Sequence, residues 1–115
     1  MCIHGLEHLP FYETQAALLE WKRVLRPGGK LVIECPNLRE ACKKFLMDPK
    51  ELDRGMFVFY GDQSMGRIED VHKSGWTPEM LIDAVQMAGF REAVERPAEH
   101  KMRKGRDFRV EAIKP

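Results

Sequence analysis

The chain has 115 residues, with 19 basic and 18 acidic side chains and a formal net charge of +1. This length suits a single domain with one core, and the balanced charge argues against a strong overall field toward nucleic acid or an anionic membrane. The three cysteines include no Cys-x-x-Cys pair, and no apolar run reaches membrane-spanning length, so we expect a reduced, cytoplasmic protein without a cysteine metal site.

The first predicted elements are the end of a strand, a loop and a helix. Residues 1–3 fit the end of a strand, and residues 6–9, between a glycine and a proline, fit the loop that follows it. Apolar residues then recur at helical spacing, which predicts an amphipathic helix from about Glu13 to Leu25. The turn Pro27-Gly28-Gly29 ends this helix, because proline disfavours a helical residue before it and glycine accepts a positive φ.

The next segment has the composition of a buried strand. Leu31, Val32 and Ile33 form a short apolar run that points to both faces of a sheet, and Pro36 ends it. Strands covered on both faces are typical of parallel sheets, so the helix, the tight turn and this strand predict half of a βαβ unit. We therefore expect an α/β fold in which this strand is interior.

Two further helix starts follow the strand. Asn37, with Glu40 three residues later, fits an N-cap, and Asp48 followed by Pro49 fits a second start. The apolar face of the first helix would comprise Leu38, Ala41, Cys42, Phe45 and Leu46, and that of the second Leu52, Met56, Phe59 and Tyr60. Residues 56–60 also fit a strand, and this alternative stays open.

The second half of the chain contains a long loop, one helix and two strands. Residues 61–75 show no periodicity, as is typical of functional or disordered loops. A threonine cap, a proline at the first helical position and a closing glycine predict a helix over residues 77–89. Residues 91–96 and 106–113 predict an antiparallel hairpin at the sheet edge. The basic residues at 100–106 fit a solvated hairpin loop or, as the alternative, a phosphate-binding patch.

An ordered set of motifs runs through nearly the whole chain. The set comprises Leu6-Glu7-His8-Leu9, Glu20-x-x-Arg23-Val24-Leu25-Arg26-Pro27-Gly28-Gly29-Lys30-Leu31, Cys35-Pro36-Asn37, Tyr60-Gly61, His72-Lys73-x-x-Trp76-Thr77 and Ala88-Gly89-Phe90. In this order it resembles the second half of the class I S-adenosylmethionine-dependent methyltransferases. The resemblance implies a partial doubly wound, Rossmann-like sheet with parallel strands, a C-terminal antiparallel hairpin and helices packed on it. Residues 1–115 would then form a single truncated methyltransferase-like domain.

The sequence lacks the features with which that family binds its cofactor. In the family, S-adenosylmethionine lies on a glycine-rich turn after the first strand, and an acidic residue after the second strand holds the ribose. No Gly-x-Gly occurs here, so we expect the lone chain to bind S-adenosylmethionine weakly if at all. The open sheet edge and a sheet face without helices would be buried by a second copy, as a dimer, or by a missing N-terminal half or other polypeptide.

The resemblance also implies positions for the site. Ile3 and His4 would line the cofactor side. Glu7, His8 and His72 are the candidate catalytic residues, because a general base is needed when the acceptor must lose a proton and histidine suits that task. For Glu7 and His8 the alternative is that they only brace the loop by hydrogen bonds, and for His72 the alternative is a surface loop histidine without a function.

Two aromatic residues are candidates for the acceptor site. Tyr60 and Trp76 would wall an acceptor pocket or, as the alternative, belong to the core. The acceptor itself is not identified: a small molecule, a sugar, a lipid and a protein all stay open, and the balanced charge disfavours nucleic acid.

A rival pattern overlaps the same loop. His4-Gly5-Leu6-Glu7-His8 matches His-x-x-Glu-His, the inverted zinc-peptidase pattern, but Gly5 and Pro10 weaken the helix that this pattern needs, so no metal site is predicted. Two function classes remain. The first is part of a methyltransferase whose donor site comes from elsewhere, and the second is a non-catalytic remnant that acts as an oligomerising or binding module.

Overall fold

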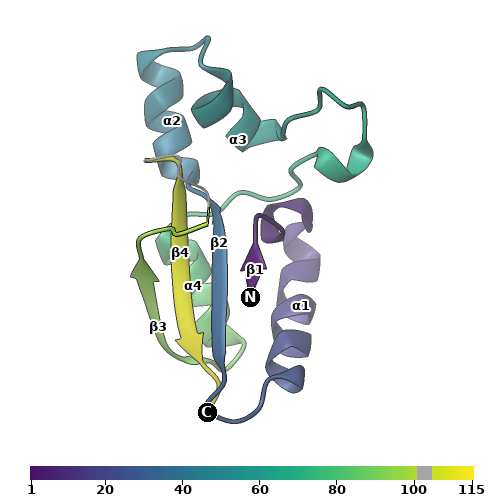
Figure 1. Ribbon diagram of the computed structural model, residues 1–115, viewed down its shortest axis with the longest axis vertical. Coiled ribbons are helices and arrows are strands. Elements are labelled where there is room, and N and C mark those ends of the chain that lie inside the picture. The colour runs from purple at the N-terminus through teal and green to yellow at the C-terminus, as the bar shows by residue number, and fades with distance from the viewer. Residues whose placement is uncertain (101–104) are drawn as a thin grey trace.

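The structure is a computed structural model that describes residues 1–100 and 105–115. A sheet forms the centre of the molecule, and helices lie beside it and beyond one of its ends (Figure 1). In chain order the elements are β1 (Cys2–Ile3), a 3-10 turn (Leu6–His8), α1 (Phe11–Val24), β2 (Lys30–Pro36), α2 (Leu38–Met47), a π turn (Leu52–Met56), α3 (Phe57–Tyr60), a second 3-10 turn (Ile68–Asp70), α4 (Pro78–Met87), β3 (Arg91–Arg96) and β4 (Asp107–Ile113).

The strands of the described chain form one mixed sheet in the order β1-β2-β4-β3. β1 runs parallel to β2, with Cys2 opposite Ile33, and β4 pairs antiparallel with both β2 and β3. The predicted α/β fold is confirmed, including a parallel pair and a C-terminal antiparallel hairpin. One feature was not predicted: the second strand of the hairpin inserts between β2 and β3.

β2 is an interior strand with neighbours on both sides. Residues 31–36 are all buried, as expected of a strand covered on both faces. The turn before β2 is fixed by two hydrogen bonds: Gly28 N–H donates to the Lys114 carbonyl oxygen, and Lys114 N–H donates to the Gly29 carbonyl oxygen, each at 2.9 Å. Gly28 has a φ of 78°, which favours glycine. The predicted helix end and the predicted interior strand are both confirmed.

The core lies between one face of the sheet and the helices α1 and α4. Ile33 and Val110 from the sheet, Leu18 from α1, and Leu81 and Val85 from α4 are the most deeply buried of these apolar side chains. The alternation of β2 and β4 side chains explains this, because every second residue of a strand points to the same face.

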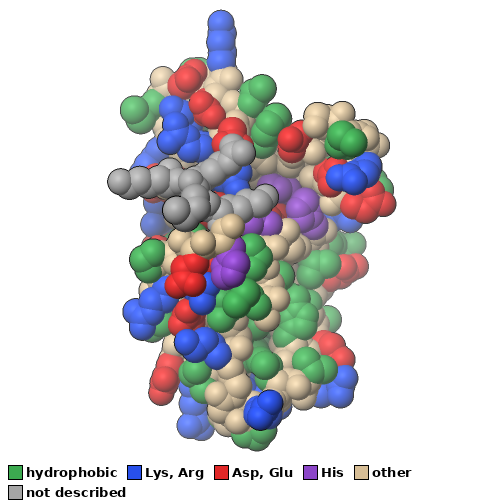
Figure 2. Space-filling view, in the orientation of Figure 1, with side chains coloured by type: hydrophobic (Ala, Val, Ile, Leu, Met, Phe, Trp, Pro, Cys, Tyr) green, Lys and Arg blue, Asp and Glu red, His purple; other side chains and the backbone are tan. Residues whose placement is uncertain are grey.

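Within residues 1–100 and 105–115, no helix packs on the opposite face of the sheet (Figure 1). Glu34 of β2 and Arg109 of β4 meet on this face, and the backbone at Glu99 and His100 donates hydrogen bonds to the Glu34 carboxylate. Figure 2 looks at this face and shows charged side chains of both signs interspersed with apolar ones. β1 lies at the sheet edge, as expected.

α2 begins as predicted, but its apolar face is only partly buried. The Asn37 side chain accepts a hydrogen bond from Arg39 N–H (3.1 Å), which confirms the N-cap. Ala41 is buried, whereas Cys42 is exposed and Leu46 is 81 % exposed, so the predicted face is wrong for these two residues. The reason is position: α2 extends beyond the ends of the strands, where the sheet cannot cover it (Figure 1).

The second helix start, predicted at Asp48, is wrong. The Asp48 carboxylate accepts a hydrogen bond from Lys50 N–H (3.2 Å) in a turn, and Glu51 caps the helical segment by accepting from two backbone N–H groups. The helical segment is a π turn followed by α3, so the alternative of a strand over residues 56–60 is also wrong. The residues of the predicted face that are instead exposed are Leu52 and Tyr60.

The second half of the chain follows the predictions closely. Residues 61–75 form a loop with one 3-10 turn, and α4 is capped by Thr77, whose hydroxyl oxygen accepts from Met80 N–H (3.3 Å). β3 is an edge strand. Of the basic segment at 100–106, residues 101–104 lie outside the described residues. Across the described residues, no helix combines the length and the apolar character needed to cross a bilayer.

Candidate functional site

A cavity of about 280 Å³ lies at the carboxyl ends of β1 and β2. This is the edge where ligands bind in open parallel sheets, because the loops that follow the strands meet there. β4 brings its first residues to the same edge, since it is antiparallel to β2 and pairs Asp107 with Pro36. Histidine side chains gather at this level in Figure 2. The titratable lining residues are His4, Glu7, His8, Asp53, Asp62, Asp70, His72 and Arg106.

The loop after β1 holds Glu7 and His8 at the cavity. His4 N–H donates to a carbonyl oxygen of β2 (2.8 Å), which extends the parallel pairing by one residue. The chain then turns at His4, whose φ is 50°, and forms the 3-10 turn that contains Glu7 and His8. Leu6, the first residue of this turn, is fully buried in the core and anchors it.

The loop of residues 61–75 is tied to this turn by backbone hydrogen bonds. The Glu7 carbonyl oxygen accepts from the N–H groups of Lys73 (2.8 Å) and Ser74 (3.1 Å), and the Ser74 hydroxyl donates back to the turn (3.2 Å). These bonds bring His72, which is far from Glu7 in the sequence, to the same cavity.

His8 and His72 lie edge to face, with ring centroids 4.8 Å apart. His8 Nδ1 contacts the Val71 carbonyl oxygen (3.2 Å), and His72 Nδ1 contacts the Val58 carbonyl oxygen (2.9 Å). A carbonyl oxygen only accepts, so both Nδ1 atoms carry a proton, and in a neutral ring the lone pair is then at Nε2. Burial outweighs the hydrogen bond to Val58 and lowers the pKa of His72, which favours the neutral ring.

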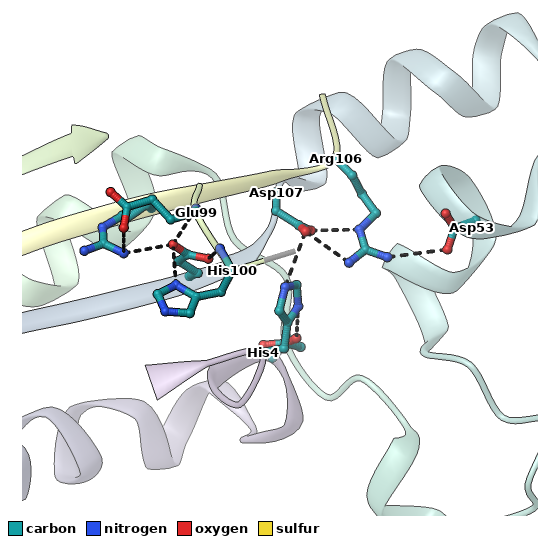
Figure 3. A network of polar contacts seen from close by, with 9 residues as sticks. His4, Asp53, Glu99, His100, Arg106 and Asp107 are labelled. Carbon is teal, nitrogen blue, oxygen red and sulfur yellow. Dashed lines mark hydrogen bonds and ion pairs between the residues drawn. The ribbon is translucent and has the colours of Figure 1, made fainter. Parts of the chain in front are cut away.

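His4 lies between two carboxylates. Its Nδ1 is 3.3 Å from Glu7 Oε1, and its Nε2 is 3.3 Å from Asp107 Oδ2. Burial opposes the charged ring, but the two carboxylates outweigh it and raise the pKa of His4 to about 9, so His4 is cationic at pH 7. Arg106 contacts Asp107 (2.8 Å) and Asp53 (3.4 Å), and Figure 3 shows this series of contacts from His4 to the turn before α3.

One oxygen of the Glu7 carboxylate has no partner in the described part of the chain. The Glu7 side chain is only 3 % exposed, Oε1 contacts His4, and Oε2 is buried without a hydrogen bond. A buried carboxylate oxygen without a donor or a cation carries an uncompensated desolvation cost. Oε2 is therefore a position where a bound proton donor or cation would be stabilised.

The structure brings four of the predicted site residues together: His4, Glu7, His8 and His72 all line the cavity. Ile3 lies apart from them and borders a second cavity, of about 410 Å³, beside α1. Trp76 is buried in the core and donates its indole N–H to the Ser74 hydroxyl (2.9 Å), as in the alternative of a core residue. The Tyr60 side chain is 62 % exposed and does not line either cavity.

The residues that line or brace the cavity and that the sequence analysis missed include Arg106, Asp53 and Asp107. Arg106 belonged to a basic segment that predicts a solvated loop, and Asp53 and Asp107 carried no motif. They reach the site because β4 inserts beside β2 and the π turn folds back toward the sheet edge. Both placements depend on long-range packing, so no local signal in the sequence could have identified these residues.

The inverted zinc-peptidase pattern is not carried by an α-helix. His4 has a positive φ, and the helical part of the segment is the 3-10 turn at Leu6–His8. The His4 ring also contacts Asp107 on one side and Glu7 on the other. His4 and His8 therefore do not share the helical face that this mechanism requires.

The described residues do not fit S-adenosylmethionine as a whole. No glycine lines the cavity, and α1, the helix after β1, starts after Pro10 and not after a glycine-rich turn that would let a ligand approach its N-terminus. The groups that are present can accept a proton, at His8 or His72, and can bind a cation.

No protein-family model matches the chain, and no curated protein matches it by sequence.

Proposed function

We propose that this chain is the acceptor-binding part of a class I S-adenosylmethionine-dependent methyltransferase, and that another polypeptide segment supplies the donor site. The observation that carries the proposal is the meeting of Glu7, His8 and His72 in one cavity at the carboxyl ends of the parallel pair. The ordered motifs that resemble this family supply two of the cavity-lining segments. In this proposal the mixed sheet is part of a doubly wound, Rossmann-like methyltransferase sheet.

The cavity has the groups that the acceptor side of methyl transfer needs. A hydroxyl or amine acceptor that gains a methyl group must lose a proton, and a positioned base near neutral pKa takes it most effectively. His72 Nε2 is the best placed base, since its Nδ1–H is fixed by the Val58 carbonyl oxygen and its ring favours the neutral form. His4, which also contacts Asp107, contacts the Glu7 carboxylate and fixes its position in the cavity wall.

Four carboxylates and three histidines, with one arginine, line a cavity of modest size. This lining suits a small polar acceptor that donates hydrogen bonds. An acidic lining repels phosphate groups, so nucleic acid is a poor candidate for the acceptor.

The donor segment would pack beside β1. β1 is an edge strand with backbone groups unpaired on its outer side, and the cavity of about 410 Å³ beside it is bordered by Met1, Ile3, Trp21 and Leu31. An open edge with an adjacent apolar cavity favours pairing with another strand. A second copy of the chain, forming a homodimer, and a separate polypeptide are both candidates for this neighbour.

The second candidate function is a non-catalytic module that retains the methyltransferase-like half-domain for oligomerisation or binding. The same open edge and the sheet face without helices favour it. It differs from the first candidate in one respect: it needs no cofactor under any condition.

Isothermal titration with S-adenosylmethionine and with its demethylated product tests the choice. The proposal predicts that the lone chain shows no measurable binding at up to about 1 mM ligand. This limit corresponds to a binding free energy weaker than about 4 kcal/mol. It predicts 1:1 binding once the segment with the glycine-rich turn, encoded upstream in frame or by a neighbouring gene, is added. Tight binding by the lone chain would contradict the divided site. A stable complex with such a segment that still binds neither ligand would contradict methyl transfer and favour the binding module.

A further inference from the structure

We propose that Glu7, His8 and His72 form a binding site for one divalent transition-metal ion, with Zn²⁺ the best match to the donor set. The inference does not rest on methyl transfer. With the ion bound, His72 Nε2 would be a ligand and not the free base described above, and the ion would take over the activation of an acceptor oxygen. One carboxylate oxygen and one nitrogen from each histidine lie within 4.8 Å of one another.

The three atoms lie within 4.8 Å of one another, which allows separations up to about 1.5 Å longer than in a bound site. Zn²⁺ binds histidine nitrogen and carboxylate oxygen at about 2.0–2.2 Å, so two ligand atoms of a tetrahedral site lie about 3.3–3.5 Å apart. Movement of about 1 Å, within the reach of side-chain rotation, would bring the three atoms to that spacing. Two histidines and one carboxylate are also the protein ligands of known catalytic zinc sites.

The hydrogen bonds around the two histidines orient them as ligands. Each ring gives its Nδ1–H to a backbone carbonyl oxygen, His8 to Val71 and His72 to Val58, so each Nε2 lone pair is free for a metal. Metal-binding histidines usually donate their second ring N–H in this way, and the bond fixes both tautomer and orientation. The two carbonyl groups come from different segments. The Val58 carbonyl lies within α3, and the Val71 carbonyl directly follows the 3-10 turn at Ile68–Asp70.

The Glu7 carboxylate is also positioned to bind a cation. Glu7 Oε1 contacts His4, which in turn contacts Asp107, so this series of contacts holds the Glu7 side chain. Glu7 Oε2 is buried and has no hydrogen-bond partner among the described residues, and a cation would remove this cost. Four carboxylates against two cationic groups, Arg106 and the protonated His4, also give the cavity an acidic lining that attracts a cation.

Three protein ligands leave at least one position open to the cavity. A metal with three protein ligands binds a water or a substrate oxygen in the remaining position and polarises it. The site would therefore take a small ligand with a hydroxyl or carboxylate oxygen. Mg²⁺ and Ca²⁺ prefer oxygen ligands, so two imidazoles select against them.

The test is calorimetric titration of the chelator-treated protein with Zn²⁺, repeated with Co²⁺ and followed by visible absorption. We expect one equivalent to bind. His8→Ala, His72→Ala and Glu7→Gln should each weaken binding at least about tenfold, by analogy with the 10–100-fold effects of groups that support metal ligands. His100→Ala, a histidine outside the cavity, and Cys42→Ser, which removes an exposed thiol, should leave the affinity unchanged.

Circular dichroism of each variant shows whether it folds, and His8→Ala is the main test because His8 is only partly buried. Wild-type protein without a 1:1 Zn²⁺ step would overturn the proposal. So would a Zn²⁺ affinity that survives both histidine variants or disappears in Cys42→Ser. Binding of Mg²⁺ as tight as that of Zn²⁺ would exclude a nitrogen-rich site.

Discussion

Gly61 is the position where a single methyl group should damage the site most selectively. Its φ of 85° and ψ of 161° belong to a region that only glycine adopts readily, and a Cβ there would lie 2.0 Å from the Asp70 carbonyl oxygen and 3.1 Å from His72 Cδ2. Gly61→Ala therefore combines backbone strain of about 1–3 kcal/mol with a clash that forces the 61–75 loop away from α3. Together, the strain and the clash should lower the free energy of unfolding by about 3 kcal/mol or more.

Gly66→Ala is the matched control, since Gly66 also has a positive φ, 68°, but has nothing within 4 Å of the position of a Cβ. It should cost only about 1 kcal/mol. Urea denaturation followed by circular dichroism measures both variants, and the histidine NMR signals report displacement of His72. Equal losses for the two variants, or unchanged His72 signals in Gly61→Ala, would refute the packing described for this loop.

Three further predictions concern stability and assembly. Burial alone would raise the pKa of Glu34. Hydrogen bonds to its carboxylate from Glu99 N–H, Arg109 and His100 outweigh burial, so the pKa is lowered from 4.5 to about 2. The stabilisation is therefore present above about pH 4.5 and is lost as the pH falls toward 2. Urea titrations at pH 5 and pH 2.5 measure this acid dependence, which should be about 1–2 kcal/mol after solvent screening. The Glu34→Gln variant should lose it. An unchanged acid dependence in Glu34→Gln would contradict the role given to the Glu34 carboxylate. Thr77→Ala should cost about 1 kcal/mol by removing the α4 cap, and no change in urea midpoint would contradict the cap. If a second copy covers β1, light scattering after size exclusion should show a dimer. A strict monomer at all concentrations would contradict self-association at β1 and favour a separate polypeptide as its neighbour.

The elements with strong local signals could be predicted from the sequence. The turn at Pro27-Gly28-Gly29 and the apolar run after it define β2, because few other conformations suit those residues. The caps at Asn37 and Thr77 are local as well, since each side chain bonds a backbone N–H two or three residues later.

Elements whose burial depends on distant parts of the chain could not be predicted in detail. Leu46 continues the apolar pattern of α2, but the sheet ends before it, so the side chain stays exposed. The start of the next helical segment moved from Asp48 to Glu51, because both acids can cap a helix and only the packing of the π turn decides between them.

The candidate site was predictable in its residues but not in its geometry. Glu7, His8 and His72 carry the resemblance to the methyltransferase family, yet nothing in the sequence places them within reach of one another. Their meeting depends on the hydrogen bonds between the loop after β1 and the 61–75 loop. Asp107 reaches the site through the insertion of β4, a pairing of strands with no local signature.

Long-range ¹H–¹⁵N NMR of the histidine rings is the most direct measurement of the cavity on which both proposals depend. At pH 7 we expect His8 and His72 in the Nδ1–H tautomer, because each Nδ1 faces a carbonyl oxygen, and His4 protonated on both nitrogens. The two Nε2 signals should shift together when Zn²⁺ is added. An Nε2–H tautomer for either His8 or His72, or Zn²⁺ shifts at only one of them, would contradict a shared site.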